Sequence, residues 1–170
     1  AIAVYLARAR TVHATAHSVR ICSGITSSLG LIVDMLRSLG VTRIAVEDPM
    51  LSLHAIVLRR AGIDLVSVPV DEDGICVARL SETGVNAVLV TPANQFPLSV
   101  TMSATRRAEL VAWARATGSW IIEDDYDGEF RYDRRPIGSL QGLAPDRVVY
   151  AGTSSKSLTP GLRLSWLVVP

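Results

Sequence analysis

The sequence predicts a three-layer α/β/α domain built on a mostly parallel, seven-stranded sheet. Two observations predict this class. Short apolar, β-branched runs alternate with stretches of helical periodicity, as they do in proteins with a parallel sheet. The runs are apolar almost throughout, so helices are expected to cover both faces of the sheet. A length of 170 residues, with 49% hydrophobic and 19% charged residues, suits one domain over residues 1–170.

Seven short runs rich in β-branched and apolar residues are the predicted strands. In chain order they are Val19–Cys22, Arg43–Glu47, Asp64–Val68, Ala87–Thr91, Trp120–Asp124, Arg147–Ala151 and Leu164–Val169. In open sheets of this kind, ligands bind at the carboxyl ends of the strands. Functional residues are therefore expected directly after strands.

Four segments carry apolar residues at helical spacing and are the predicted helices. Three of them are followed by glycine, which readily takes the left-handed conformation at a helix end. One begins at a serine that can cap it. The segments are Ala1–Arg10; Thr26–Leu39, followed by Gly40; Leu51–Ala61, followed by Gly62; and Ser103–Thr117, followed by Gly118.

Composition and charge exclude several classes of protein. A formal net charge of +1 gives no electrostatic reason for this stretch itself to bind nucleic acid. The apolar runs are far shorter than the ~20 residues of a membrane helix, and no signal-peptide pattern opens the chain. Cys22 and Cys76 form no CxxC or zinc spacing. We therefore expect a soluble cytoplasmic domain without a metal site or membrane contact.

Lys156 is the only lysine of the chain, which has sixteen arginines. Either cation serves at most surface positions, so a single retained lysine suggests a place where arginine fails. Arginine cannot lose its proton at usable pH, whereas a lysine amine can do so and form a Schiff base. The alternative is chance retention on a solvated face, and composition leaves both interpretations open.

The turn Ser23–Thr26 follows the first predicted strand and opens the first long helix. Such a turn directs free backbone N–H groups and the positive end of a helix dipole at an anion, typically a phosphate. Gly24 allows close approach of the backbone to a ligand. Many ordinary strand-to-helix turns also contain serine and glycine, so this signal is weak alone.

Five acidic residues occupy seven positions from Glu123 to Glu129, directly after an apolar strand. Carboxylates at a strand end can bind a metal, pair with a cationic ligand, or act as acid and base. The structural alternative is a solvated acidic loop, or partners for the nearby arginines. That alternative explains Asp124 least well, because Asp124 lies nearest the buried strand end. The arginines are Arg131, Arg134 and Arg135.

The segment Ala151–Lys156 places three hydroxyl residues before the lone lysine, and Arg163 follows seven positions later. Hydroxyls and a guanidinium suit a phosphate, and a lysine beside them suits a phosphate-bearing aldehyde. An anion-binding helix start, a strand-end carboxylate and this lysine all follow strands. Together they indicate a pyridoxal phosphate site.

Four segments carry a resemblance to a known family. They are Val46–Pro49 (VEDP), Thr91–Pro97 (TPANQFP), Ile122–Tyr132 (IEDDYDGEFRY) and Gly152–Leu164 (GTSSKSLTPGLRL). The chain resembles the large domain of fold-type-I aminotransferases. More narrowly, it resembles the aminotransferase-like domain of MocR regulators, a branch of the GntR transcription factors.

The resemblance implies a role for each matching residue. Lys156 would form the Schiff base with the cofactor, and Asp124 would pair with the pyridine nitrogen. Tyr126 would hydrogen-bond the phenolic oxygen, with Asn94 and possible help from Gln95 at the same ring edge. The residues implied around the phosphate are Ile25, Thr26, Thr153, Ser155 and Arg163.

The chain also departs from the family pattern. Leu51 stands where an aromatic ring commonly stacks on the cofactor, and Asn94 replaces a histidine common in the regulators. Leu98–Ser99 replaces Thr-Gly, and Ser154 replaces an aromatic residue. Lysine, aspartate and tyrosine all remain, so these changes weaken the expectation of efficient catalysis more than that of cofactor binding.

Three functions follow as alternatives. The first is a regulator domain that senses an amino compound through Schiff-base exchange at Lys156, while a separate winged helix-turn-helix domain binds DNA. The second is a working aminotransferase acting on an amino acid. The third is a dimerisation scaffold without cofactor, against which the retained Lys156 argues. The resemblance also implies a homodimer with its sites at the subunit interface, and a small domain outside this chain.

Several other residues receive purely structural interpretations. The histidines have no second ligand at metal spacing, two tryptophans suit the core, two adjacent arginines suit a solvated helix start, and the cysteines suit small buried hydrophobes. These residues are His13, His17, His54, Trp113, Trp120, Arg106, Arg107, Cys22 and Cys76.

Overall fold

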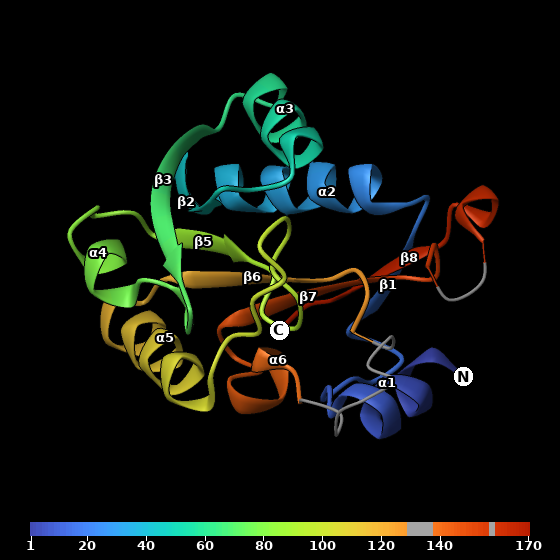
Figure 1. Cartoon of the computed structure of the whole chain (residues 1–170). Helices are drawn as coiled ribbons and strands as arrows, with labels where there is room; N and C mark the ends of the chain where they lie inside the picture. Colours follow the sequence, from blue (N-terminus) through green and yellow to red (C-terminus); the bar gives the residue numbers. More distant parts are fainter. Residues whose placement is uncertain (129–137, 157–158) are drawn as a thin grey trace.

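The computed structural model describes residues 1–128, 138–156 and 159–170, and its described strands form a single sheet between helices (Figure 1). The strands are β1 (Val19–Cys22), β2 (Arg43–Asp48), β3 (Asp64–Asp71), β4 (Gly74–Ile75), β5 (Ala87–Val90), β6 (Trp120–Asp125), β7 (Val148–Thr153) and β8 (Ser165–Val168). The helices are α1 (Ile2–Arg10), α2 (Ile25–Ser38), α3 (Ser52–Arg60), α4 (Val77–Ser81), α5 (Ala104–Thr117) and α6 (Leu140–Leu143), with a 3-10 turn η1 (Pro160–Leu162).

The sheet is mostly parallel, as predicted, but its described part has eight strands in the order β1-β8-β7-β6-β5-β2-β3-β4. The central strands β3, β2, β5, β6 and β7 pair in parallel, and the edges pair antiparallel. The predicted number of seven was wrong by one. The additional strand, Gly74–Ile75, returns antiparallel beside the end of β3, and two residues are too few to show a period in the sequence.

Helices cover the sheet on both faces, which confirms the three layers. α2 and α3 pack together on one face, while α4, α5 and α6 lie on the other (Figure 1). The alternation of side chains along β5 serves both cores. Val88 and Val90 join the cluster that contains Leu110 of α5, whereas Leu89 joins the cluster that contains Leu36 of α2.

The predicted helix ends are confirmed at α5. Its N-cap is Ser103, whose hydroxyl accepts a hydrogen bond from the Arg106 backbone N–H at 3.2 Å. Gly118 follows the helix in the left-handed conformation, with φ of 70°. Among the residues that the structure places, no helix is long and apolar enough to cross a membrane.

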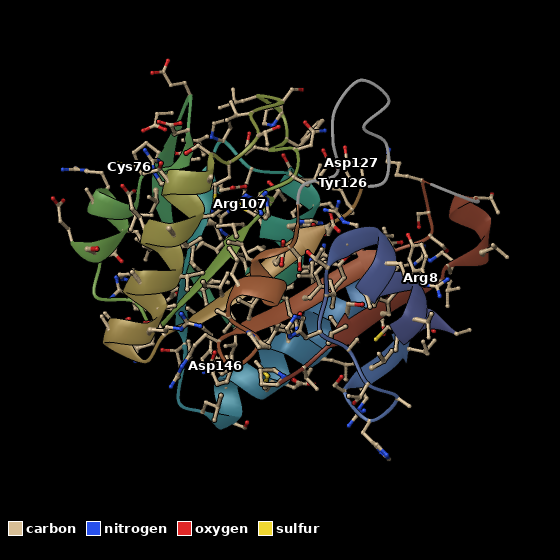
Figure 2. The ribbon with its side chains drawn as sticks, turned by 90° about the horizontal axis from the view of Figure 1, so that it is seen from below. Arg8, Cys76, Arg107, Tyr126, Asp127 and Asp146 are labelled. Atoms are coloured by element: carbon tan, nitrogen blue, oxygen red, sulfur yellow. The ribbon has the colours of Figure 1, made fainter. Side chains whose placement is uncertain are left out.

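The expectation of a solvated helix start at Arg106 and Arg107 was wrong. Arg106 binds Asp71, with Nη2 to Oδ2 at 3.0 Å. Arg107 is buried on α5 (Figure 2), and its Nη2 donates to the Pro92 carbonyl at 2.8 Å while its Nη1 donates to the Gly138 carbonyl at 2.9 Å. A guanidinium whose donors all find carbonyl or carboxylate oxygens can be buried without a large penalty.

Helix α1 is tied to the end of β6 by a buried ion pair. Arg10 Nε lies 2.6 Å from Asp125 Oδ2, and its Nη1 donates to the Gly128 carbonyl at 2.9 Å. The Tyr150 hydroxyl donates to the same Asp125 carboxylate at 2.5 Å. Because Asp125 lies between Asp124 and Tyr126, this network fixes the backbone that presents both neighbours.

Replacing Arg10 by alanine is expected to lower the free energy of unfolding by about 3–5 kcal/mol, because it leaves the buried Asp125 carboxylate without its cation. Urea unfolding would measure the loss. Arg8→Ala, at an exposed position on the same helix, is the matched control and should change stability by less than about 0.5 kcal/mol. Equal stability of the two variants would contradict a structural role for the Arg10 pair.

Candidate functional site

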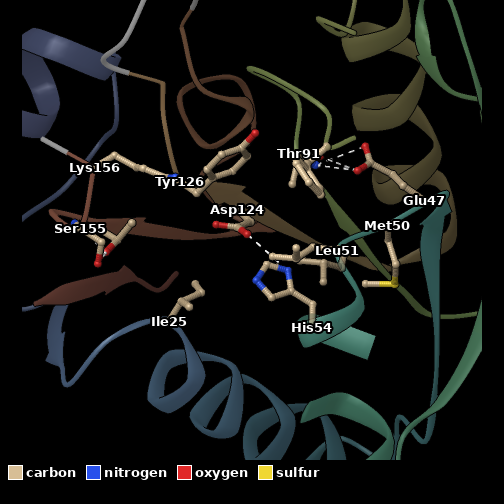
Figure 3. A pocket seen from close by; sticks show the side chains of 13 residues that line it. Ile25, Glu47, Met50, Leu51, His54, Thr91, Asp124, Tyr126, Ser155 and Lys156 are labelled. Atoms are coloured by element: carbon tan, nitrogen blue, oxygen red, sulfur yellow. Dashed lines mark hydrogen bonds and ion pairs between the residues drawn. The ribbon is translucent and has the colours of Figure 1, made fainter. Parts of the chain in front are cut away.

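A cavity of about 350 Å³ opens where the parallel strands end, between the first turns of α2 and α3 (Figure 3). Its position follows the rule that ligands bind at the carboxyl ends of strands in an open α/β sheet. Apolar side chains make up part of the wall, and titratable side chains face them. The lining residues are Ile25, Glu47, Met50, Leu51, His54, Leu89, Thr91, Phe96, Asp124, Tyr126, Thr153, Ser155 and Lys156.

Asp124, at the end of β6, is a buried carboxylate without a hydrogen-bond donor. It is 1% exposed, and neither of its oxygens has a hydrogen-bond partner within the described residues. Burial raises the pKa of Asp124 to about 8, and the negative charges of Asp125 and Glu47 act in the same direction. A buried carboxylate left without partners costs stability, so this group is suited to a ligand that brings a positive N–H donor.

His54 faces Asp124 from α3, with Nδ1 3.5 Å from Asp124 Oδ2 (Figure 3). Burial lowers the pKa of His54 to about 4, so its ring is neutral at neutral pH. From the sequence His54 was interpreted as a surface or packing residue, and its position in the cavity was not predicted. Helical periodicity carried a signal, because Leu58 lies one turn further along the same buried face of α3.

Glu47 is a second buried carboxylate of the cavity, and its position there was not predicted from the sequence. Its oxygens accept hydrogen bonds from Thr91, with Oγ1 to Oε2 at 2.5 Å and the backbone N–H to Oε1 at 3.2 Å. Burial raises the pKa of Glu47 to about 7, although the hydrogen bonds from Thr91 oppose this shift. Its place at the end of β2 obeys the same strand-end rule that singled out Asp124.

Tyr126 and Asn94 come together at another edge of the site. Asn94 Nδ2 lies 3.1 Å from the Tyr126 hydroxyl oxygen and 2.6 Å from Asp127 Oδ2. Burial raises the pKa of Tyr126, and the charge of Asp127 raises it further. The phenol therefore keeps its proton and can donate it to a ligand oxygen.

A cluster of groups suited to an anion lies at the start of α2. Gly24 is the N-cap with φ of 90° and no side chain to cap the helix. A Cβ at this glycine would lie 3.2 Å from Arg163 Nε, so the guanidinium packs against the turn. Thr153 Oγ1 and Ser155 Oγ lie 2.9 Å apart close by on the cavity wall. Free N–H groups, a guanidinium and hydroxyls are the groups that bind phosphate.

The structure brings most of the predicted site residues together. Six of them line the cavity: Ile25, Asp124, Tyr126, Thr153, Ser155 and Lys156. Asn94 reaches it through Tyr126, while Arg163 and Thr26 lie beside the start of α2 rather than in the wall. Leu51 supplies an apolar side chain to the cavity, at the position where the family pattern commonly has an aromatic ring.

The acidic segment is not a solvated loop where the structure describes it. The Glu123 carboxylate accepts from the Leu140 and Gln141 backbone N–H groups, each at 2.9 Å, and Asp125 binds Arg10. Over the described ranges, no cluster of histidine, cysteine, aspartate and glutamate could hold a metal. Glu129 and the arginines proposed as its partners lie outside the described residues; these are Arg131, Arg134 and Arg135.

Comparison with solved structures identifies the class of protein. An archaeal alanine:glyoxylate aminotransferase matches 99% of this chain with a TM-score of 0.90 and 28% identity, and the match covers 44% of that enzyme chain. The chain thus has the fold of the fold-type-I aminotransferase large domain, as its motifs predicted.

Sequence relatives narrow the class. The chain is 41% identical over 99% of its length to the uncharacterised HTH-type transcriptional regulator YdeL of Bacillus subtilis. It is 35% identical over its whole length to the probable rhizopine catabolism regulatory protein MocR of Rhizobium meliloti. It spans 36% and 34% of these relatives, and no protein-family profile matches it. The chain is therefore homologous to a segment of MocR/GntR-type regulators, which confirms the predicted resemblance.

Proposed function

We propose that this chain binds pyridoxal phosphate and is the aminotransferase-like domain of a transcriptional regulator that responds to an amino compound. The observation that carries the proposal is the Asp124 carboxylate, which lines the cavity and has no hydrogen-bond partner among the described residues. A protonated pyridine nitrogen is the positive N–H donor that this carboxylate lacks. Pairing with it would return the raised pKa of Asp124 toward its ordinary range.

The other residues of the site fit the rest of the cofactor. Leu51 offers an apolar side chain to the ring, and Tyr126 with Asn94 offers hydroxyl and amide donors to the ring oxygen. The start of α2 and Arg163 suit the phosphate, together with the hydroxyls of Thr153 and Ser155. Lys156, exposed at the end of β7, is the primary amine beside them.

When bound, pyridoxal phosphate supplies an aldehyde that condenses with primary amines and a ring that withdraws electrons. The chain's own residues do the rest. Lys156 would hold the cofactor through its primary amine. Asp124 keeps the proton on the ring nitrogen, and His54, neutral at neutral pH, stands beside this carboxylate without adding a competing charge.

The regulator part of the proposal follows from the relatives, of which this chain spans about a third. Residues 1–170 would be the cofactor-binding large domain, with the small domain and the DNA-binding domain outside it. An amino compound would act as effector by replacing Lys156 at the cofactor. We further propose that the protein works as a homodimer in the cytoplasm, where its DNA lies.

The test is an absorption titration of the full-length protein with pyridoxal phosphate, followed by borohydride reduction and peptide mapping. We expect a visible band of the bound cofactor and a reduced adduct on the peptide that contains Lys156. Lys156 is the only lysine of residues 1–170, so an adduct that maps to this segment has a single possible lysine. A folded protein that shows neither the band nor the adduct would overturn the proposal.

A working aminotransferase is the second candidate, favoured by the 28% identity with a solved aminotransferase. Both functions begin with the exchange of an amine at Lys156, so cofactor binding does not separate them. The two functions are separated by measuring whether the full-length protein releases keto acids from a panel of amino acids. Multiple turnovers would establish the enzyme, whereas amine-dependent change in DNA binding without turnover would establish the regulator.

A further inference from the structure

Asp127 is a carboxylate directly behind the cavity wall, in a small hollow that shares Tyr126 and Lys156 with the cavity. The proposed function gives it no task. Asp127 follows Tyr126 directly after β6, and Figure 2 labels both residues. Its Oδ2 accepts a hydrogen bond from Asn94 Nδ2 at 2.6 Å. Asn94 comes from the segment after β5, so this contact joins two strand ends. Asn94 Nδ2 also lies 3.1 Å from the Tyr126 hydroxyl oxygen. Asp127 is therefore linked to both residues that are expected to bind the ring oxygen of the cofactor.

The short contact determines how the Asn94 amide is oriented. An ionised carboxylate can accept hydrogen bonds but cannot donate them, so the amide nitrogen rather than the amide oxygen must face Asp127. That nitrogen carries two hydrogens, and Asp127 and the Tyr126 oxygen take one each. The bond to the carboxylate is charge-assisted and is the stronger of the two. A ligand oxygen would therefore replace Tyr126 as acceptor and leave Asp127 in place.

Asp127 also acts through its charge. Burial raises the pKa of Asp127, and the hydrogen bonds from Asn94 and from the Tyr126 hydroxyl oppose this shift. The charge of Asp125 raises the pKa further, and that of Lys156 lowers it. Its Oδ1 is buried without a hydrogen-bond partner in the described part of the chain. The titratable groups that interact with Asp127 are Tyr126, Asp125, Asp124 and Lys156. Arg10, Tyr5 and Tyr150 line the same small hollow beside it. The negative charge of Asp127 reaches both the ring edge and the lysine.

We propose that Asp127 is a positioning residue that orients the Asn94 amide and disfavours negative charge at the ring oxygen of the bound cofactor. The proposal rests on the proposed function. A carboxylate beside an ionisable oxygen favours the protonated form of that oxygen, and beside a nitrogen it favours the cationic form. Both effects would raise the pH at which the ring oxygen and the Lys156 nitrogen lose a proton. Asp127 would thereby set the pH range over which an amine can replace Lys156.

The test follows the absorption spectrum of the full-length protein, loaded with pyridoxal phosphate, as a function of pH. In Asp127→Asn the midpoint of the spectral transition is expected to fall by roughly one pH unit, as for loss of a nearby charge. Asp127→Glu keeps the charge and should stay near the wild-type midpoint. Asp34→Asn removes a charge from an exposed position on α2 and should not move the midpoint.

The outcomes separate this inference from the function on which it rests. A wild-type protein that binds no cofactor would overturn the proposed function. If the wild type binds and Asp127→Asn has an unchanged midpoint, the role of Asp127 is wrong and the cofactor site stands. Asp127→Ser supplies a second variant without the charge, and its midpoint should fall in the same direction; circular dichroism would verify that each variant is folded.

Discussion

Replacing Lys156 by alanine is expected to abolish covalent attachment of pyridoxal phosphate and leave the fold intact. The loss should be complete at this site, because Lys156 lines the cavity and is the only lysine of the chain. Lys156 is exposed, so shortening it removes no core packing and should change the free energy of unfolding by less than about 0.5 kcal/mol. The cofactor should still bind weakly through the contacts to its phosphate and ring.

The measurement is the mass of the protein after incubation with pyridoxal phosphate and reduction with borohydride. Lys156→Arg is the matched control, since it keeps the positive charge but cannot condense with an aldehyde at usable pH. Both variants should lack the adduct on this segment, whereas the wild type carries it. An adduct that maps elsewhere and persists at wild-type yield in Lys156→Ala would contradict the assignment.

Replacing Asp124 by asparagine is expected to have opposite effects on stability and on cofactor binding. In the cofactor-free protein, Asp124 is a buried carboxyl without a hydrogen-bond partner in the described residues. Asparagine keeps its shape but cannot ionise, so the substitution should stabilise the fold by about 1–3 kcal/mol at a pH where the wild-type carboxyl is ionised. In the loaded protein the same change removes a charge-assisted hydrogen bond, so affinity for pyridoxal phosphate should fall at least about tenfold.

The stability effect should depend on pH, and its sign follows from the raised pKa. Burial raises the pKa of Asp124 to about 8, whereas the ordinary value of an unfolded aspartate is about 3.9. The unfolded chain therefore releases this proton at lower pH than the folded protein does. Between about pH 4 and 8 the wild type should lose stability relative to Asp124→Asn as pH rises, with the difference levelling off above that range.

Urea unfolding of the cofactor-free protein at several pH values measures the first effect, and absorption titration measures the second. Asp34→Asn, at an exposed position on α2, controls for the loss of one negative charge. A stability difference that does not change with pH would contradict the burial of an ionisable Asp124. Unchanged affinity for the cofactor would contradict its pairing with the ring nitrogen.

The sequence by itself determined the layered α/β fold and much of the candidate site. Strands such as Ala87–Val90 and Trp120–Asp125 could be predicted because both faces of a parallel sheet are buried, so consecutive residues of its strands are apolar. Parallel strands end at one edge, so a residue that follows a strand is placed there whatever its partners are. That reasoning located Asp124 and Lys156, which both line the cavity.

Only the tertiary structure decided which polar side chains meet. Adjacent Arg106 and Arg107 look alike in the sequence, yet one binds Asp71 near the surface and the other is buried. His54 comes within 3.5 Å of Asp124 although its helix α3 packs mainly on α2 and β3, and Asn94 meets Asp127 across two strand ends. Local patterns report which face of an element is apolar. Contacts between distant polar groups depend on how the elements pack. A change of about one ångström in the donor–acceptor distance is enough to make or break a hydrogen bond.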